Sequence, residues 1–333
     1  MLGAALPKSL RPLLFRLEES FPPLAARRLY KPFPYILQVE TTSYCNADCV
    51  ICPYPETAKE IPMGIMDEAL YRKIVDECAL HDVKVFEPFL NNEPLLDRKF
   101  PQRLDYTHGK LPNAKIQVNS NLTVMSDEAA AALVRNVDVL LLSAHGITAE
   151  DYEAVMPKVK FARFLENVDR LLAVPGRERM RITVNCVNTA GRPDEEIRRF
   201  WAARGLDVSI SPYVDRAGNV TEAEALKAGK QGVPEGTLLD PKAKPKLNGC
   251  WSTDIPLMKM NIAFNGDAVL CCMDWRREEV LGNVREHSIA DVWQSADYWR
   301  VRDALYANGP IHDNFLCFRC RNPDPSGRHA KFW

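Results

Sequence analysis

The chain has 333 residues, of which 46% are hydrophobic and 26% are charged, and its formal net charge is −1. This balance is typical of a globular protein and excludes a disordered chain. Because the sequence has no basic excess, we expect no nucleic-acid partner, and its length allows one large α/β domain with a smaller appendage.

Residues 1–35 are predicted to form an N-terminal helical extension. Pro7 and Pro12 interrupt its apolar positions and no cleavage-like site of small residues follows, which argues against a signal peptide. Nowhere does a run of about eighteen apolar residues occur, so no membrane span is predicted. We therefore expect a cytoplasmic protein with no membrane partner.

Short β-rich runs alternate with helical patterns from residue 36 to residue 213, as in parallel strands joined by helical crossovers. The predicted strands are Ile36–Thr42, Val83–Phe89, Lys115–Asn121, Val139–His145, Arg181–Asn188 and Leu206–Tyr213, and the predicted helices include Met66–His81, Ser126–Asn136, Phe161–Ala173 and Pro193–Arg204. Right-handed crossovers would curl such a sheet into a partial (β/α)6 barrel of the TIM type. Loops at the carboxyl ends of its strands should line the functional site.

A connecting segment is predicted at 214–249, where the alternation stops and glycine and proline accumulate. A second, small α+β unit is predicted at 250–333. Its expected elements are a hairpin of Met258–Phe264 and Ala268–Met273 around the turn Asn265-Gly266, and a helix from Ser288 to Tyr306.

Ten cysteines in a chain without an export signal should be reduced thiols, so their grouping indicates metal binding rather than disulfides. Cys78 lies in a helical pattern and Cys186 in a strand pattern, and both are predicted to pack as small hydrophobic residues. The remaining cysteines cluster as metal ligands would.

The first group, Cys45, Cys49 and Cys52, follows the first predicted strand directly, at the carboxyl edge of the barrel. Three thiolates cannot complete a four-iron cluster, so one iron would be open to another ligand. A structural zinc site would need four protein ligands, and no fourth Cys or His lies nearby.

The Cys-x3-Cys-x2-Cys spacing resembles that of the radical S-adenosylmethionine (SAM) family, and the resemblance extends over about residues 36–213. It implies a [4Fe-4S] cluster whose open iron binds the amine and carboxylate of SAM. Asn91-Asn92-Glu93-Pro94 resembles the family's Gly-Gly-Glu motif, which implies that Glu93 and the backbone around Asn92 hold the methionine ammonium. By the same resemblance, the other expected SAM contacts are Ile51, Asn119, Asn121 and Ser143.

The second group consists of Cys250, Cys271, Cys317 and Cys320, which could hold a four-iron cluster, with structural zinc as the alternative. Resemblance to the SPASM/Twitch extension of radical SAM enzymes is carried by Gly266-x4-Cys271, Gly282-Asn283-Val284, Ile289-x3-Trp293 and the closing Cys-x2-Cys. Because no cysteine follows Cys320, the resemblance implies the shorter Twitch form with one auxiliary [4Fe-4S] cluster. Cys272 is left over, since on a strand it would point away from Cys271.

The resemblance implies that SAM is cleaved to a 5′-deoxyadenosyl radical, which removes hydrogen from a carbinol-type carbon. We expect a small polar substrate of the sugar or aminocyclitol kind. Epimerisation with Cys272 as hydrogen donor is the main hypothesis, because a thiol S–H bond is weaker than most C–H bonds. The alternatives are a dehydrogenase that uses the auxiliary cluster as electron acceptor, a ribosomal-peptide-modifying enzyme, and an Fe–S electron-transfer module.

Candidate substrate contacts near strand ends and beyond Cys272 are His145, Asn188, Tyr213, Asp215 and Asp274. A flavodoxin- or ferredoxin-type protein is the expected reductant.

Overall fold

The computed structural model describes residues 30–211, 213, 216–220, 247, 250, 255–307 and 309–320. Most of the predicted N-terminal extension and of the connecting segment, together with Asp215 and the residues after Cys320, lies outside the described residues. The domain boundaries of the sequence analysis stay predictions.

One nine-stranded sheet runs through the described residues, in the order β6-β5-β4-β3-β2-β1-β7-β8-β9. Its strands are β1 Ile36–Val39, β2 Val85–Glu87, β3 Lys115–Ser120, β4 Val139–Ser143, β5 Arg181–Val187, β6 Asp207–Ser211, β7 Lys259–Ile262, β8 Asp267–Val269 and β9 Val280–Asn283. Neighbours from β6 to β1 are parallel, and β7 also pairs with β1 in parallel, whereas β8 and β9 are antiparallel. The C-terminal strands therefore extend the barrel sheet beyond β1.

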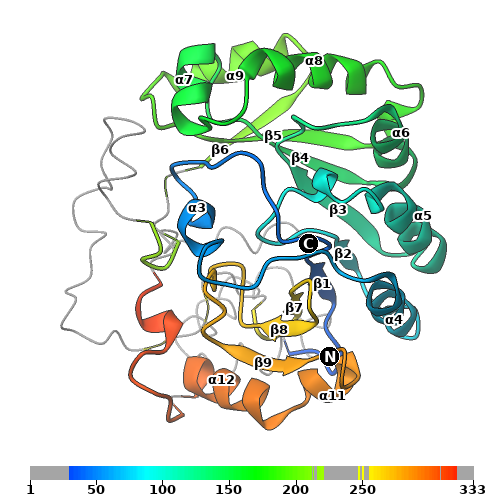
Figure 1. Ribbon diagram of the computed structural model, residues 1–333, viewed down its shortest axis with the longest axis vertical. Helices are drawn as coiled ribbons and strands as arrows, with labels where there is room; N and C mark the ends of the chain where they lie inside the picture. Colours follow the sequence, from blue (N-terminus) through cyan, green and yellow to red (C-terminus); the bar gives the residue numbers. More distant parts are fainter. Residues whose placement is uncertain are drawn as a thin grey trace, which may run out of the picture.

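Helices form the outer layer of the curved parallel part, from α4 round to α9, while α11 and α12 lie along the C-terminal strands (Figure 1). The helices are α3 Tyr54–Thr57, α4 Glu68–Cys78, α5 Phe100–Lys110, α6 Asp127–Asn136, α7 Ala149–Val155, α8 Phe161–Leu172, α9 Asp194–Ala202, α11 Ile289–Trp293 and α12 Ala296–Tyr306, with short 3-10 turns η1 Pro94–Leu96, η2 Arg177–Arg179 and η3 Leu316–Phe318. The predicted N-cap of α6 is confirmed, because the Ser126 hydroxyl accepts the Ala129 N–H at 3.1 Å. This architecture confirms the predicted partial barrel with a C-terminal hairpin and helix.

Two C-terminal elements differ from their predictions. The single helix expected from Ser288 to Tyr306 is two helices, because Ser295 adopts an extended conformation and caps α12 by accepting the Tyr298 N–H. The strand expected to reach Met273 ends at Val269, so Cys271 and Cys272 lie in the loop that follows β8. The prediction that strand alternation separates these two thiols is therefore wrong.

Two hydrophobic cores hold the fold together. One packs the β3–β6 half of the barrel and contains Cys186, which is 2% exposed. The other joins β1 and α4 to the C-terminal strands and helices and contains Cys78, which is fully buried. Both cysteines are thus packed in the interior, as predicted. Because the second core includes Leu37 of β1 and Met260 of β7, the start of the barrel and the C-terminal region pack as one body.

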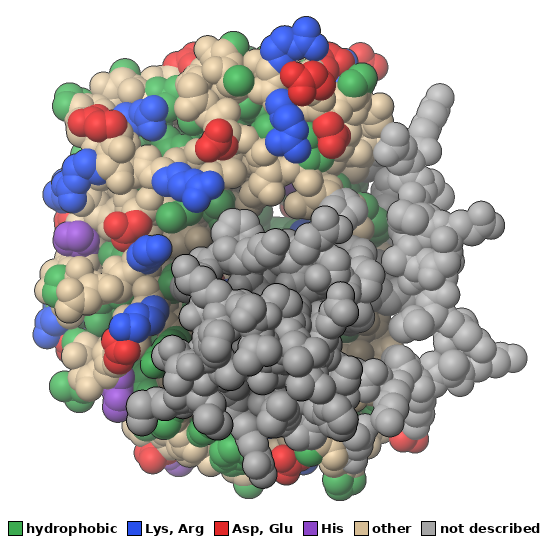
Figure 2. All heavy atoms as spheres, turned by 180° about the vertical axis from the view of Figure 1, so that it is seen from behind, with side chains coloured by type: hydrophobic (Ala, Val, Ile, Leu, Met, Phe, Trp, Pro, Cys, Tyr) green, Lys and Arg blue, Asp and Glu red, His purple; other side chains and the backbone are tan. Residues whose placement is uncertain are grey.

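One face of the surface shows charges of both signs. In Figure 2 the visible Lys and Arg side chains are interspersed with Asp and Glu on the part of that face that the structure describes. Within the described ranges, no helix has the length and apolar character needed to cross a membrane.

Candidate active site

The loop of residues 45–52, here called the cluster loop, joins β1 to α3 at the carboxyl end of the parallel strands. In Figure 1, α3 lies between the barrel strands and the C-terminal strands. The Cys45 N–H donates to the Tyr54 hydroxyl at 2.8 Å, and the Cys52 N–H donates to the Cys49 carbonyl at 3.0 Å. These bonds fold the loop back on itself and bring its three cysteines together.

Burial raises the pKa of all three thiols of the cluster loop. The pKa of Cys45 rises to about 12, first through burial and then through the nearby Glu93 carboxylate. After burial, Cys52 and Cys45 are the main charges that raise the pKa of Cys49. Buried thiols this close together become thiolates only beside a compensating cation, so the donor chemistry fits iron. Among the described residues, no three His, Cys, Asp or Glu side chains converge on the position of a single metal ion.

Glu93 fastens the loop after β2 to the end of β3. Its carboxylate accepts the Ser120 hydroxyl at 2.7 Å, the Asn121 N–H at 2.6 Å and the Leu95 N–H at 3.1 Å. Burial raises the pKa of Glu93 to about 7 despite these bonds. Asn92 accepts the Leu90 N–H at 2.8 Å, while its buried Nδ2 has no hydrogen-bond partner in the described part of the chain. This amide N–H is therefore a donor that a ligand could use.

The remaining predicted SAM contacts gather around the same edge. Ser143 donates to Asn119 Oδ1 at 3.2 Å, and Asn121 Nδ2 donates to Asn46 Oδ1 at 2.9 Å, which ties β3 to the cluster loop. Ile51 is only 4% exposed and packs in the barrel core. The structure thus brings these residues together, and their contacts with SAM stay predictions.

Arg216 places a positive charge near Cys52 of the cluster loop, and His145 lies near Arg216. The Val187 N–H donates to His145 Nδ1 at 3.1 Å, so a neutral His145 carries its proton on Nε2. Burial, followed by the charge of Arg216, lowers the pKa of His145 to about 4. The same guanidinium offsets part of the rise that burial causes in the pKa of Cys52, and its buried Nε has no hydrogen-bond partner among the described residues. No sequence pattern marks Arg216, which follows β6 in a segment without periodicity.

The other candidate substrate residues lie in different surroundings. Asn188 donates to the Arg192 carbonyl at 2.7 Å and stabilises its own loop. Tyr213 packs against the barrel core, and Asp215 lies outside the described residues. Asp274 lies deep between the two halves of the molecule, and burial raises its pKa to about 6.

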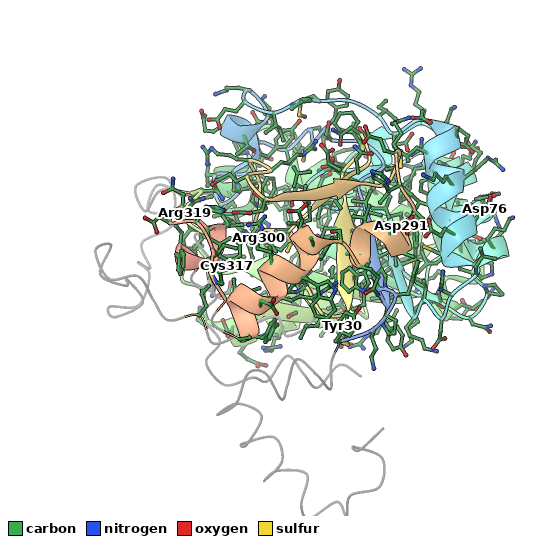
Figure 3. All side chains as sticks on the ribbon, turned by 90° about the horizontal axis from the view of Figure 1, so that it is seen from below. Tyr30, Asp76, Asp291, Arg300, Cys317 and Arg319 are labelled. Atoms are coloured by element: carbon green, nitrogen blue, oxygen red, sulfur yellow. The ribbon has the colours of Figure 1, made fainter. Side chains whose placement is uncertain are left out.

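The second cysteine group is gathered from three separate stretches of chain: the residue Cys250, the loop after β8 with Cys271, and the stretch in and after the turn η3 with Cys317 and Cys320, of which Cys317 is labelled in Figure 3. Burial first, then Cys272, Cys317 and Cys250, raises the pKa of Cys271. After burial, Cys250 and Cys320 raise the pKa of Cys317. The Met273 N–H donates to Cys271 Sγ at 3.4 Å, the kind of bond that tunes iron–sulfur ligands. The fold therefore brings the four predicted ligands close together.

A buried ion pair links the region around the cluster loop to the loop that carries Cys271. Arg277 Nη2 donates to Glu40 Oε2 at 2.8 Å, and both side chains are at most 9% exposed. The same carboxylate oxygen accepts the Phe264 N–H at 3.1 Å. Nearer the surface, Arg276 pairs with Glu60 at 2.7 Å. Sequence reasoning missed these contacts, because Glu40 and Arg277 are far apart in the chain and no motif marks either one.

Two family models match the chain. The radical SAM superfamily model matches residues 39–201, and the model of an iron–sulfur cluster-binding domain, SPASM, matches residues 250–321. Among curated proteins, the chain is 19% identical over 289 residues to the S-adenosyl-L-methionine-dependent 2-deoxy-scyllo-inosamine dehydrogenase of Niallia circulans. That alignment covers 86% of this chain and 92% of the dehydrogenase.

Solved structures share the fold at low sequence identity. A crystal structure of BtrN in complex with AdoMet and 2-DOIA has a TM-score of 0.55 and 16% identity, and the match covers 81% of this chain and 86% of BtrN. SuiB of Streptococcus suis bound to the precursor peptide SuiA has a TM-score of 0.63 and 16% identity, with 95% of this chain and 75% of SuiB covered. Native anSMEcpe with bound AdoMet has a TM-score of 0.57 and 14% identity, with 86% and 87% covered. The chain belongs to the radical SAM superfamily and carries a C-terminal SPASM iron–sulfur domain.

Proposed function

We propose that the protein is a radical SAM dehydrogenase that oxidises a carbinol carbon of a small aminocyclitol-like substrate. The observation that carries the proposal is the grouping of the C-terminal thiols, in which Cys271 lies near Cys250 and Cys317, and Cys317 lies near Cys250 and Cys320. Likeness along most of the chain to the 2-deoxy-scyllo-inosamine dehydrogenase supports the substrate class. These findings favour oxidation over the epimerisation that the sequence alone suggested.

The roles of the residues follow from their positions. Cys45, Cys49 and Cys52 would hold a cluster with one open iron, while Asn92, Glu93, Asn119, Asn121 and Ser143 line the same edge of the barrel. When bound, the two clusters and SAM would supply a 5′-deoxyadenosyl radical that takes the carbinol hydrogen atom, and an acceptor for the second electron. The hydroxyl proton then passes to solvent, which completes the two-electron oxidation to a ketone.

The buried surroundings also protect such chemistry from side reactions. Glu93 is 2% exposed and holds the strand ends in place through three hydrogen bonds. Neutral His145 offers Nε2–H as a donor, because its Nδ1 accepts the Val187 N–H. A flavodoxin- or ferredoxin-type protein is the proposed source of the first electron.

Epimerisation remains the second candidate, because Cys272 leaves a half-buried thiol directly beside the predicted ligand Cys271. Under that alternative, the thiol would return a hydrogen atom to the carbon radical and no net oxidation would occur. Peptide modification is a third candidate, supported only by the shared fold with SuiB and anSMEcpe.

One experiment separates these functions. Anaerobically reconstituted protein is incubated with SAM, dithionite and 2-deoxy-scyllo-inosamine in deuterated water, and 5′-deoxyadenosine, ketone and deuterium incorporation are measured. Oxidation predicts a ketone in equal amount to 5′-deoxyadenosine, unchanged in a Cys272→Ala variant. Deuterated, inverted cyclitol without ketone, lost in Cys272→Ala, would refute the dehydrogenase and establish the epimerase.

A further inference from the structure

A small pocket is lined by residues that neighbour both predicted cluster sites in the chain. Its lining includes Ser43 and Tyr54, which flank the cluster loop, and Val269 and Asp274, which flank Cys271 and Cys272. The ion pair of Glu40 and Arg277 forms part of its wall. A molecule in this pocket would touch both halves of the protein.

Two hydrogen-bond donors in the pocket wall are unused. Arg277 Nη1 and Trp275 Nε1 are both buried, and neither has a hydrogen-bond partner among the described residues. Buried donors are rarely left unpaired, because each costs on the order of 1–3 kcal/mol. Since Glu40 already neutralises the guanidinium, these N–H groups suit a neutral oxygen such as a hydroxyl group better than an anion.

The pocket lining also includes a carboxylate that has no counter-ion in the described part of the chain. Asp274 is 1% exposed, and its oxygens accept the Glu278 N–H at 2.8 Å and the Glu279 N–H at 3.0 Å. No Lys, Arg or His of the described residues forms an ion pair with it, although each oxygen can accept a further bond. A buried charge is normally paired, so a cationic group of a ligand is the missing partner.

We infer that Asp274, Trp275 and Arg277 form a substrate subsite that recognises an amino alcohol, with Asp274 binding the ammonium group and the two N–H donors binding a ring hydroxyl. The inference rests on the proposed function, and it deepens it by assigning the amine-recognition residue. The sequence marked Asp274 as a candidate substrate contact but not Trp275 or Arg277, because the three residues lie in an irregular loop between β8 and β9.

Ligand binding tests the subsite without any turnover. Reconstituted full-length protein with SAM and no reductant is titrated calorimetrically with 2-deoxy-scyllo-inosamine and with scyllo-inositol, which lacks the amine. In the Asp274→Asn variant we expect the inosamine to bind about 10- to 100-fold more weakly, with little change for scyllo-inositol. Trp275→Phe should weaken both ligands by about 2- to 10-fold, because it removes a donor to a hydroxyl group.

Matched controls use exposed residues of α12, where Asp297→Asn and Trp299→Phe should leave both affinities unchanged. An unchanged ratio of the two affinities in Asp274→Asn, or no inosamine binding to the wild type, overturns the subsite. A different outcome would refute the proposed function alone: inosamine binds in a way that depends on Asp274, but no ketone forms once dithionite has reduced the protein. If Asp274→Asn does not fold, two other measurements test the subsite. They are the equal decrease in affinity for both ligands in Trp275→Phe, and the higher affinity of the wild type for the inosamine than for scyllo-inositol.

Discussion

The two cysteine groups of this protein are built in opposite ways. Cys45, Cys49 and Cys52 come from one short loop, and the hydrogen bonds that the Cys45 and Cys52 N–H groups donate are local. The second group draws Cys250 and Cys317 from distant parts of the chain and depends on the β7–β9 strands and η3 to bring them together. The first site is thus specified by a motif and the second by the fold.

We expect the junction between the barrel and the C-terminal strands to contribute to the stability of the second group. The C-terminal strands share one hydrophobic core with β1 and α4, and the buried Glu40–Arg277 pair joins the same two regions. Damage to that junction should therefore disturb the second cysteine group before it disturbs the cluster loop. The following predictions test the contrast in order of expected effect.

The largest effect is expected for Cys45→Ala. Removing one of three ligands should abolish 5′-deoxyadenosine formation and remove roughly half of the iron, because the cluster loop has no spare thiol. Iron and sulfide analysis with an assay of SAM cleavage measures both. Cys78→Ala, a buried cysteine outside both groups, should keep its iron, and retained SAM cleavage in Cys45→Ala would contradict the assignment.

Next comes Cys317→Ala, which should remove roughly half of the iron while SAM cleavage continues. Ketone formation should fall to background, since the residue lies in the group proposed to hold the electron acceptor. The comparison of 5′-deoxyadenosine with ketone measures this uncoupling. Zinc in place of iron at the C-terminal group, or ketone formed at the wild-type rate, would contradict the proposal that this group holds the electron acceptor.

A smaller effect, on stability, is expected for Glu40→Gln. Leaving Arg277 buried without its partner should lower the free energy of unfolding by about 3–5 kcal/mol. The exposed pair of Arg135 and Asp105 gives a matched control, and Asp105→Asn should cost about 1 kcal/mol or less. Urea unfolding followed by circular dichroism measures both changes. Equal decreases in the free energy of unfolding would show that the buried pair contributes no more to stability than the exposed one.

The smallest effect is a pH dependence. Folding lowers the pKa of His145 from 6.5 to about 4. Between these two pH values the unfolded chain is therefore protonated at His145 while the folded protein is not. Stability should therefore fall as the pH drops from about 6.5 towards 4, and His145→Gln should make that fall less steep. Unfolding midpoints between pH 4.5 and 7 test it, and parallel curves for the two proteins would exclude His145 as a contributor.

The sequence determined the features that depend on local order along the chain. Alternating β-rich and helical patterns are sufficient to predict the six strands β1–β6 and their order along the chain, because buried parallel strands need continuous apolar runs. The spacing of Cys45, Cys49 and Cys52 identified the cluster loop, and the Asn265-Gly266 turn identified the hairpin. The sequence also predicts both groups of cysteine ligands, and their role as ligands stays a prediction.

Tertiary structure decided the features that depend on contacts between distant residues. Strand periodicity misplaced Cys272, since β8 ends where the chain turns to meet Glu279 rather than where its β propensity stops. The ion pair of Glu40 with Arg277 carries no sequence signal, and the sequence marked Asp274 only as a candidate substrate contact. A charge reveals its partner, or the lack of one among the described residues, only after folding has buried it.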